Sequence, residues 1–151
     1  MKKFHADWHA AAPARSEAAC VLPRLIGNYF IHGDKVVRPR TSEKSLHEFR
    51  LATKRARYTL ELFEPLYGAA LKPHLEGLKK VQQVLGQLND CQASLELLTQ
   101  LDAAIHPLTL DPAWLETIAL RRDKKRGEFA RLWLDEFTDP LRRESWILAL
   151  E

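Results

Sequence analysis

Apolar residues recur along this chain at intervals of three and four, the pattern of helices that bury one face. Prolines, glycines and short polar stretches separate the segments that carry this pattern. The segments predicted to be helical are 16–31, 45–64, 71–101, 112–137 and a short amphipathic tail after Pro140. No stretch alternates apolar and polar residues between turn signals, as a strand would. The pattern therefore predicts an all-α protein, an antiparallel four-helix up-down bundle with a short C-terminal helix.

Local signals mark several helix boundaries. Ser45 and Glu48 have the spacing of a capping box, in which each side chain accepts a hydrogen bond from the other residue's backbone amide. The Gly33–Asp34 pair is expected to end the first helix, because glycine is common just past helix ends. Asp111 precedes Pro112, which is an N-cap residue followed by proline at the favoured first helical position.

Length and composition limit the kind of protein. The chain has 151 residues, of which 46% are apolar and 28% charged, which predicts one folded domain with a single core. We expect residues 1–15 to form a flexible leader and residues 16–151 to form the helical bundle. Cys20 and Cys91 lie far apart without ligand spacing, which predicts two free thiols in a reducing compartment. No run reaches the roughly 18 apolar residues of a membrane helix, so the sequence predicts a cytoplasmic protein.

The formal net charge is only +3, but the cations are unevenly distributed. At about 100° per residue, the helix over 45–64 has an apolar face made of Phe49, Ala52, Ala56, Leu60 and Phe63. The opposite face carries His47, Arg50, Lys54 and Arg57. Like charges at this spacing destabilise a helix, and bound anions reverse that effect. A ladder of cations at a pitch of about 5.4 Å suits a linear polyanion, and the alternative is a solvated surface face.

A second cationic cluster lies in the helix over 112–137. Residues 121–131 contain six Lys or Arg and two acids. Arg122 and Lys125 fall in the middle of an apolar stripe. That stripe consists of Trp114, Leu115, Ile118, Phe129, Leu132 and Trp133. An unpaired buried charge costs several kcal/mol, so the stripe predicts a polar channel, nearby acids or a bound anion. The alternative is that both side chains extend along apolar surface and place their charged ends in water.

Two sequence blocks resemble the CHAD family, the conserved histidine α-helical domain. The first block covers residues 45–63 and has a histidine, an arginine three residues on and a run rich in Lys and Arg. The matching residues are His47, Arg50, Lys54, Arg55, Arg57 and Tyr58. The second block covers residues 78–90 and contains the Leu-Gly and Asn-Asp pairs of the family.

The resemblance implies a helical bundle that binds inorganic polyphosphate in a basic cavity, often on polyphosphate granules. The residues that it places at the anion site are His47, Arg50, Lys54, Arg57 and Lys79. Arg122 and Lys125 join them on the helical-wheel argument. The family domain usually has two four-helix halves, whereas this chain has one signature and the length of one half. We therefore expect a two-fold homodimer, the simplest symmetric assembly.

Other functions use some of the same features. A histidine phosphotransfer protein also presents a histidine on a helical bundle, but Arg50 and Leu51 stand where such proteins carry Lys and Gly. Nucleic-acid binding would use the same cations. The aromatic residues that can stack on bases, Trp114 among them, fall on the apolar face, and we expect them in the core. No carboxylate cluster or His/Cys spacing offers a metal site or a nucleophile, so the sequence predicts neither an enzyme nor a cofactor.

Overall fold

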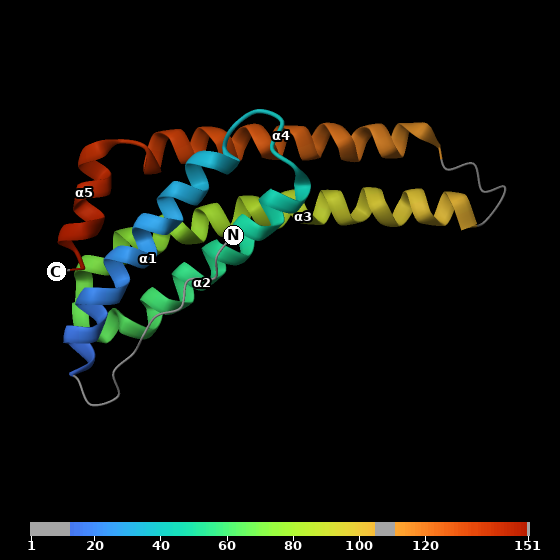
Figure 1. The fold of residues 1–151 in the computed structure, drawn as a ribbon. Coiled ribbons are helices and arrows are strands. Elements are labelled where there is room, and N and C mark those ends of the chain that lie inside the picture. Colours follow the sequence, from blue (N-terminus) through green and yellow to red (C-terminus); the bar gives the residue numbers. More distant parts are fainter. Residues whose placement is uncertain (1–12, 105–110, 151) are drawn as a thin grey trace.

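Every secondary-structure element in the described part of the chain is helical. The computed structural model describes residues 13–104 and 111–150. The elements are α1 (Ala14–Val36), α2 (Glu43–Tyr67), the 3₁₀ turn η1 (Gly68–Leu71), α3 (Lys72–Ala104), α4 (Pro112–Phe137) and α5 (Pro140–Leu148). Helices α1 to α4 alternate in direction, and α5 crosses the end of the bundle where α3 begins (Figure 1). The predicted all-α fold with a short C-terminal helix is confirmed.

The capping residue of α2 is Ser42 rather than the predicted Ser45. The Ser42 side chain accepts a hydrogen bond from the Ser45 backbone amide at 3.2 Å, so the helix begins at Glu43, one turn earlier than expected. Ser42 offers the same hydroxyl chemistry as Ser45, and hydroxyl residues are favoured at this position. The prediction for α4 is confirmed, since the Asp111 carboxylate accepts from the Ala113 amide at 2.9 Å.

Helix α1 continues through Gly33 to Val36, so the predicted end at Gly33–Asp34 is wrong. Position 33 has no room for a side chain, because the Trp133 indole lies against it. A Cβ at this position would be 2.0 Å from Cζ2 of Trp133. Asp34 accepts hydrogen bonds from Trp133 Nε1 at 3.0 Å and from Arg143 at 2.6 Å. Gly33 and Asp34 therefore attach the end of α1 to α4 and α5. Of the predicted leader, residues 1–12 lie outside the described residues, and α1 begins at Ala14.

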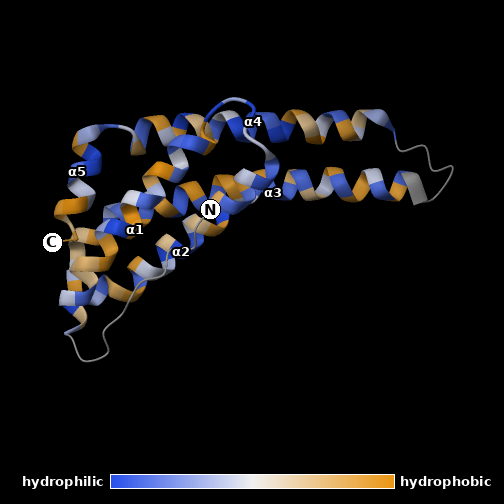
Figure 2. Cartoon of the chain, in the orientation of Figure 1, coloured by the Kyte–Doolittle hydropathy of each residue, from blue (hydrophilic) through white to orange (hydrophobic). Residues whose placement is uncertain are grey.

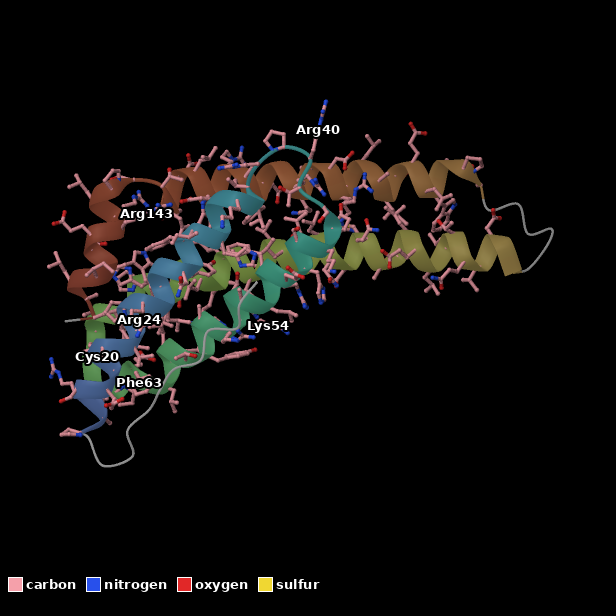
Figure 3. The ribbon with its side chains drawn as sticks, viewed as in Figure 1. Cys20, Arg24, Arg40, Lys54, Phe63 and Arg143 are labelled. Atoms are coloured by element: carbon pink, nitrogen blue, oxygen red, sulfur yellow. The ribbon has the colours of Figure 1, made fainter. Side chains whose placement is uncertain are left out.

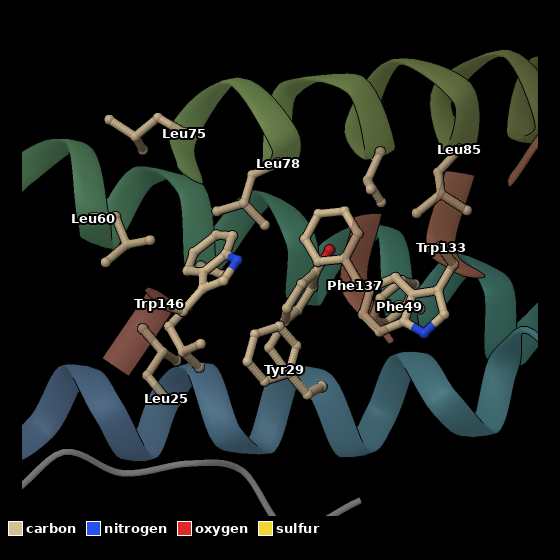
Figure 4. Packing of buried hydrophobic residues seen from close by; sticks show 14 of the residues in the cluster. Leu25, Tyr29, Phe49, Leu60, Leu75, Leu78, Leu85, Trp133, Phe137 and Trp146 are labelled. Carbon is tan, nitrogen blue, oxygen red and sulfur yellow. The ribbon is translucent and has the colours of Figure 1, made fainter. Parts of the chain in front are cut away.

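Aromatic side chains from four helices fill the centre of the core (Figure 4). Tyr29 of α1 stacks on Phe49 of α2 with ring centroids 5.0 Å apart. Trp133 and Phe137 of α4 stack at 4.8 Å, and Trp133 meets Phe49 edge-on at 5.3 Å. Trp146 of α5 packs against this group. Burying each of these side chains stabilises the fold by about 1.5–3 kcal/mol, so this cluster fixes where α2 lies.

Helices α3 and α4 extend past α1 and α2 as a two-helix arm, residues 92–104 and 112–122 (Figure 1). No side chain of residues 92–102 or 112–122 is buried. Trp114 was predicted to be in the core but is 67% exposed, because α3 is the only described helix beside this part of α4. Apolar and polar residues both occur along the arm, as they do along the rest of the bundle (Figure 2). In the described ranges, no helix combines the length and apolar character needed to cross a membrane.

Candidate functional site

Five of the seven predicted site residues lie along one line where α2 packs against α3, which we call the seam. They are His47, Arg50, Lys54 and Arg57 of α2 and Lys79 of α3. The α2 residues follow one another at intervals of three and four, so they share a helix face. That face is beside α3 because the apolar face, with Phe49, Ala56 and Leu60, is buried in the core.

Two hydrogen bonds cross the seam. His47 Nδ1 donates to the amide oxygen of Asn89 at 2.9 Å, and Arg57 Nε donates to the amide oxygen of Gln82 at 2.8 Å. Because an amide oxygen only accepts, the proton of the neutral imidazole is on Nδ1 and Nε2 remains available. Gln82 and Asn89 are two helical turns apart, with Gly86 between them. A Cβ on Gly86 would meet no atom within 4 Å, so the seam is open beside this glycine.

The cations at the far end of the seam are already paired. Arg57 donates to Glu61 at 2.7 Å, its guanidinium lies 4.4 Å from the centroid of the Tyr58 ring, and its side chain is 16% exposed. Lys79 donates to Glu76 at 2.7 Å, and this hydrogen bond is the main reason that the pKa of Lys79 is raised. These contacts fix the positions of both cations and offset part of their charge.

Arg50 and Lys54, in contrast, form no hydrogen bond or ion pair with any side chain in the described ranges. Lys54 projects from α2 (Figure 3) and is half-buried. Arg50 Nε is buried without a hydrogen-bond partner. Leaving a buried donor unpaired costs about 1–3 kcal/mol, because its hydration is lost without replacement. These two cations therefore keep both their charge and their donors for a ligand.

A groove of about 440 Å³ lies at one end of the seam, between the start of α2 and α3. Its polar lining residues are Glu43, Lys44, His47, Arg50, Asn89, Gln92 and Glu96. Both carboxylates are engaged: Glu43 accepts from Arg126 of α4, and Glu96 accepts from the Gln92 amide nitrogen at 2.8 Å. The Gln92 amide oxygen is buried and has no partner. The groove thus contains an unpaired donor, an unpaired acceptor and two cations, Lys44 and Arg50.

Arg122 and Lys125 are separate from the seam. Arg122 pairs with Asp123 at 2.8 Å, and Lys125 pairs with Glu128 at 2.7 Å. Their side chains are 28% and 20% exposed, so nearby acids and partial exposure accommodate the charges that interrupt the apolar stripe. Neither residue lines the groove at the start of α2, and Lys125 lines a different groove between α3 and α4.

The uncharged residues of the site were missed by sequence reasoning. Gln82, Asn89 and Gln92 carry no charge, and a search for cation clusters passes over them. A usable signal was present in the spacing: Gln82, Gly86 and Asn89 follow one another at four and three residues and so share a helix face. In the described part of the chain, no group of three or more His, Cys, Asp or Glu side chains is placed to hold a metal ion.

Comparison with protein families gives a match to the CHAD domain over residues 1–99 of the 151-residue chain. Both sequence blocks, residues 45–63 and 78–90, fall inside this range, as do all residues of the seam and of its groove. Arg122 and Lys125 lie outside it. No curated protein and no solved structure matched the chain.

Proposed function

This chain belongs to the CHAD domain family, and on that premise we propose that it binds inorganic polyphosphate along the seam. The observation that carries the proposal is the row of cations on α2, in which Arg50 and Lys54 have no partner among the described side chains. The proposed role is binding without catalysis, in the cytoplasm and on polyphosphate granules. Among the described residues, the seam presents donors and cations but no cysteine or serine beside a histidine.

The length and chemistry of the seam support a linear polymer. His47 and Arg57 are ten residues apart, which corresponds to about 15 Å of helix. A single small phosphate would contact one part of this row, whereas a polyphosphate chain can contact all of it. Guanidinium groups bind phosphate oxygens through paired N–H donors, and the ammonium of Lys54 adds a point charge between them.

The two cations of α4 have a lesser part in the proposal. Arg122 and Lys125 each hold a carboxylate, so a phosphate group must compete with Asp123 or Glu128 for them. We propose that they add to the general attraction of the polymer rather than to its main site.

Binding of long-chain polyphosphate at 50 and 200 mM salt tests the proposal. For nucleic acids, the logarithm of the binding constant falls linearly with the logarithm of the salt concentration, and each phosphate that the protein neutralises steepens this slope by about 0.7–0.9. We expect a similar salt dependence here. Arg50→Ala/Lys54→Ala should weaken binding about tenfold or more, since a hydrogen bond to a charged group contributes about 1.5–3 kcal/mol. Arg121→Ala/Lys124→Ala removes the same charge from the exposed surface of α4 and is the matched control.

Two results would overturn the proposal: no binding at low salt, or equal binding by the Arg50→Ala/Lys54→Ala variant. Single-stranded RNA at matched phosphate concentration separates polyphosphate binding from general nucleic-acid binding. RNA that displaces polyphosphate at equal phosphate concentration would favour the nucleic-acid alternative.

The proposal includes a two-fold homodimer that assembles through the arm. The arm exposes large apolar side chains, by 42–67% each: Leu97, Leu101, Trp114 and Leu120. Two helices cannot bury these residues between them, and the arm of a second copy would supply the missing two helices of a bundle. Light scattering with size-exclusion chromatography at tens of micromolar should report a dimer, and Trp114→Asp/Leu120→Asp should report a monomer. If the wild-type protein is a monomer, the proposed homodimer is wrong, whereas the proposal that the seam binds polyphosphate is unaffected.

A further inference from the structure

The groove at the start of α2 holds a donor and an acceptor that the rest of the described chain leaves unsatisfied. Arg50 Nε and the Gln92 amide oxygen are both buried and unpaired, and both residues line the groove. The Gln92 amide nitrogen donates to Glu96 at 2.8 Å, which identifies the oxygen as the free atom. A ligand that satisfies both residues must accept a hydrogen bond from Arg50 and donate one to Gln92.

Carboxylates join the cations of the seam at this groove. From Arg57 to Arg50 the α2 face is cationic, whereas past His47 the groove is lined by Glu43 and Glu96 as well as by Lys44. Their carboxylates accept hydrogen bonds from Arg126 and Gln92. A further phosphate beyond Lys44 would meet the two carboxylates and no additional lining cation. The row of α2 cations therefore ends within the groove, at Arg50 and Lys44.

We propose that the groove receives the terminal phosphate of a linear polyphosphate chain, an inference that rests on the proposed function. An internal phosphate has one strongly acidic oxygen and carries no proton near neutral pH. A terminal phosphate has a second ionisable oxygen, whose proton in phosphate monoesters has a pKa of about 6, so it holds a proton readily where an acceptor is close. Of the phosphates in the polymer, only the two terminal ones can accept from Arg50 and also donate to Gln92.

The remaining groups of the groove suit the same ligand. Lys44 supplies a second cation for the additional charge of the chain end. His47 Nδ1 is occupied by Asn89, and Nε2 donates to the next phosphate when the imidazole is protonated. The Arg50 and Gln92 side chains turn toward the groove as the ligand enters, since their unpaired atoms lie beneath its surface in the free protein. The rest of the polymer then runs along Lys54 and Arg57 toward Lys79.

Capping the ends of the polymer tests the proposal. Linear polyphosphate of one length is compared with the same chains after their terminal phosphates are converted to phosphoramidates with a secondary amine, so that the capping nitrogen carries no N–H donor. Capping removes the ionisable oxygen of each end and leaves every internal phosphate unchanged. At low salt we expect the wild-type protein to bind the uncapped chains at least fivefold more tightly than the capped chains.

Two variants show whether the groove is responsible for that preference. Gln92→Leu removes the acceptor, and Arg50→Lys keeps the positive charge but removes Nε. Both should bind capped and uncapped chains equally, and circular dichroism checks that each is folded. If the preference survives in both folded variants, bulk of the cap rather than the groove explains it and the inference is wrong.

The capping experiment also distinguishes recognition of the chain end from polyphosphate binding as a whole. Equal binding of capped and uncapped chains by the wild-type protein overturns terminal recognition and leaves polyphosphate binding in place. Binding of neither form at low salt overturns both.

Discussion

The indole of Trp133 lies directly on the backbone of Gly33, so that a Cβ on this glycine would be 2.0 Å from Trp133 Cζ2. The glycine is inside α1, and the tryptophan comes from α4, a hundred residues later in the chain. The contact brings α1 and α4 together at the centre of the core, beside Phe49 of α2. The position of α2, and with it the seam, therefore depends on a residue that has no side chain.

Gly33→Ala should destabilise the protein by about 1–3 kcal/mol, because the indole is rigid and the added methyl group has no space. Alanine in a helix interior is normally more stable than glycine by about 0.5–1 kcal/mol, so the expected sign is opposite to that of helix propensity. Urea denaturation measures the effect. Gly127→Ala, at a helical glycine with no atom near an added Cβ, is the control and should be neutral or stabilising. Similar losses in both variants would contradict the packing explanation.

Thr53 is the one buried polar residue found in the described core, and its hydroxyl links two helices. It donates to the Phe49 carbonyl at 3.0 Å and accepts from the Tyr29 hydroxyl at 3.3 Å. Burial raises the pKa of Tyr29 far above its usual range, so the phenol stays protonated and remains a donor. Thr53→Val leaves this donor unpaired and should cost about 1–3 kcal/mol.

The double variant Tyr29→Phe/Thr53→Val removes donor and acceptor together. It should lose less stability than the sum of the two single variants, since no buried polar group is then unpaired. A double-mutant cycle from urea unfolding gives the coupling energy. Strict additivity would show that the Tyr29–Thr53 hydrogen bond contributes nothing.

Glu61→Gln should increase polyphosphate affinity about two- to fivefold. The Glu61 carboxylate holds Arg57 at 2.7 Å, and the partly exposed pair is stabilised by about 0.2–1 kcal/mol that a phosphate must overcome. The amide removes the competing charge and leaves the guanidinium beside Gln82. Glu48→Gln removes one negative charge from another face of the same helix and is the control. Isothermal titration at low salt compares the variants, and a gain for Glu48→Gln equal to that for Glu61→Gln would reduce the effect to net charge.

The protein should lose stability as the pH falls from 7.5 to 5. Burial lowers the pKa of His74, more than a hydrogen bond with the Ser145 backbone raises it, and burial also lowers the pKa of His32. Below the unfolded-state pKa of about 6.5, the unfolded chain binds protons that the folded chain does not. The loss begins there and stops once the pH is below the folded-state pKa of both histidines.

His74→Phe keeps a ring against Trp146, from which the His74 ring centroid is 4.4 Å, and removes one of the two titrations. The variant should show a smaller fall in unfolding free energy between pH 7.5 and 5. Urea titrations at four or five pH values measure this slope. An unchanged slope would mean that His74 is equally protonated in the folded and unfolded states.

The helices and most of the core follow from local periodicity, and the sequence predicts these well. The five helical segments were each placed, and Phe49, Ala56 and Leu60 are buried as their spacing requires. The predictions that were wrong concern features that depend on residues far away in the sequence. The end of α1 could not be placed from Gly33, because the reason for a glycine there is an indole of α4. A helical wheel for Trp114 carries no information on whether other helices reach that part of α4.

The candidate site was predicted in part for the same reason. Charge and spacing identify the α2 cations, because both are properties of one helix. They do not show that Arg57 is held by Gln82 or that His47 is held by Asn89, since those partners are uncharged and lie on another helix. The helical wheel predicts that some nearby group compensates the charge of Arg122. That group is the carboxylate of the adjacent Asp123, which the wheel places on a different face.

The arm and the rest of the bundle differ in local stability. Backbone amides of α3 near Leu78 and Leu85 open only when the core opens, whereas amides of residues 92–102 and 112–122 have no buried side chains to hold them. Hydrogen exchange in the arm will therefore be fast, while the seam stays protected. The core can keep its structure while the arm beyond Glu96 opens, so this part of the arm can change in length or sequence without disturbing the cations of α2. Gln92 and Glu96 are the exception, because they line the groove beside Arg50.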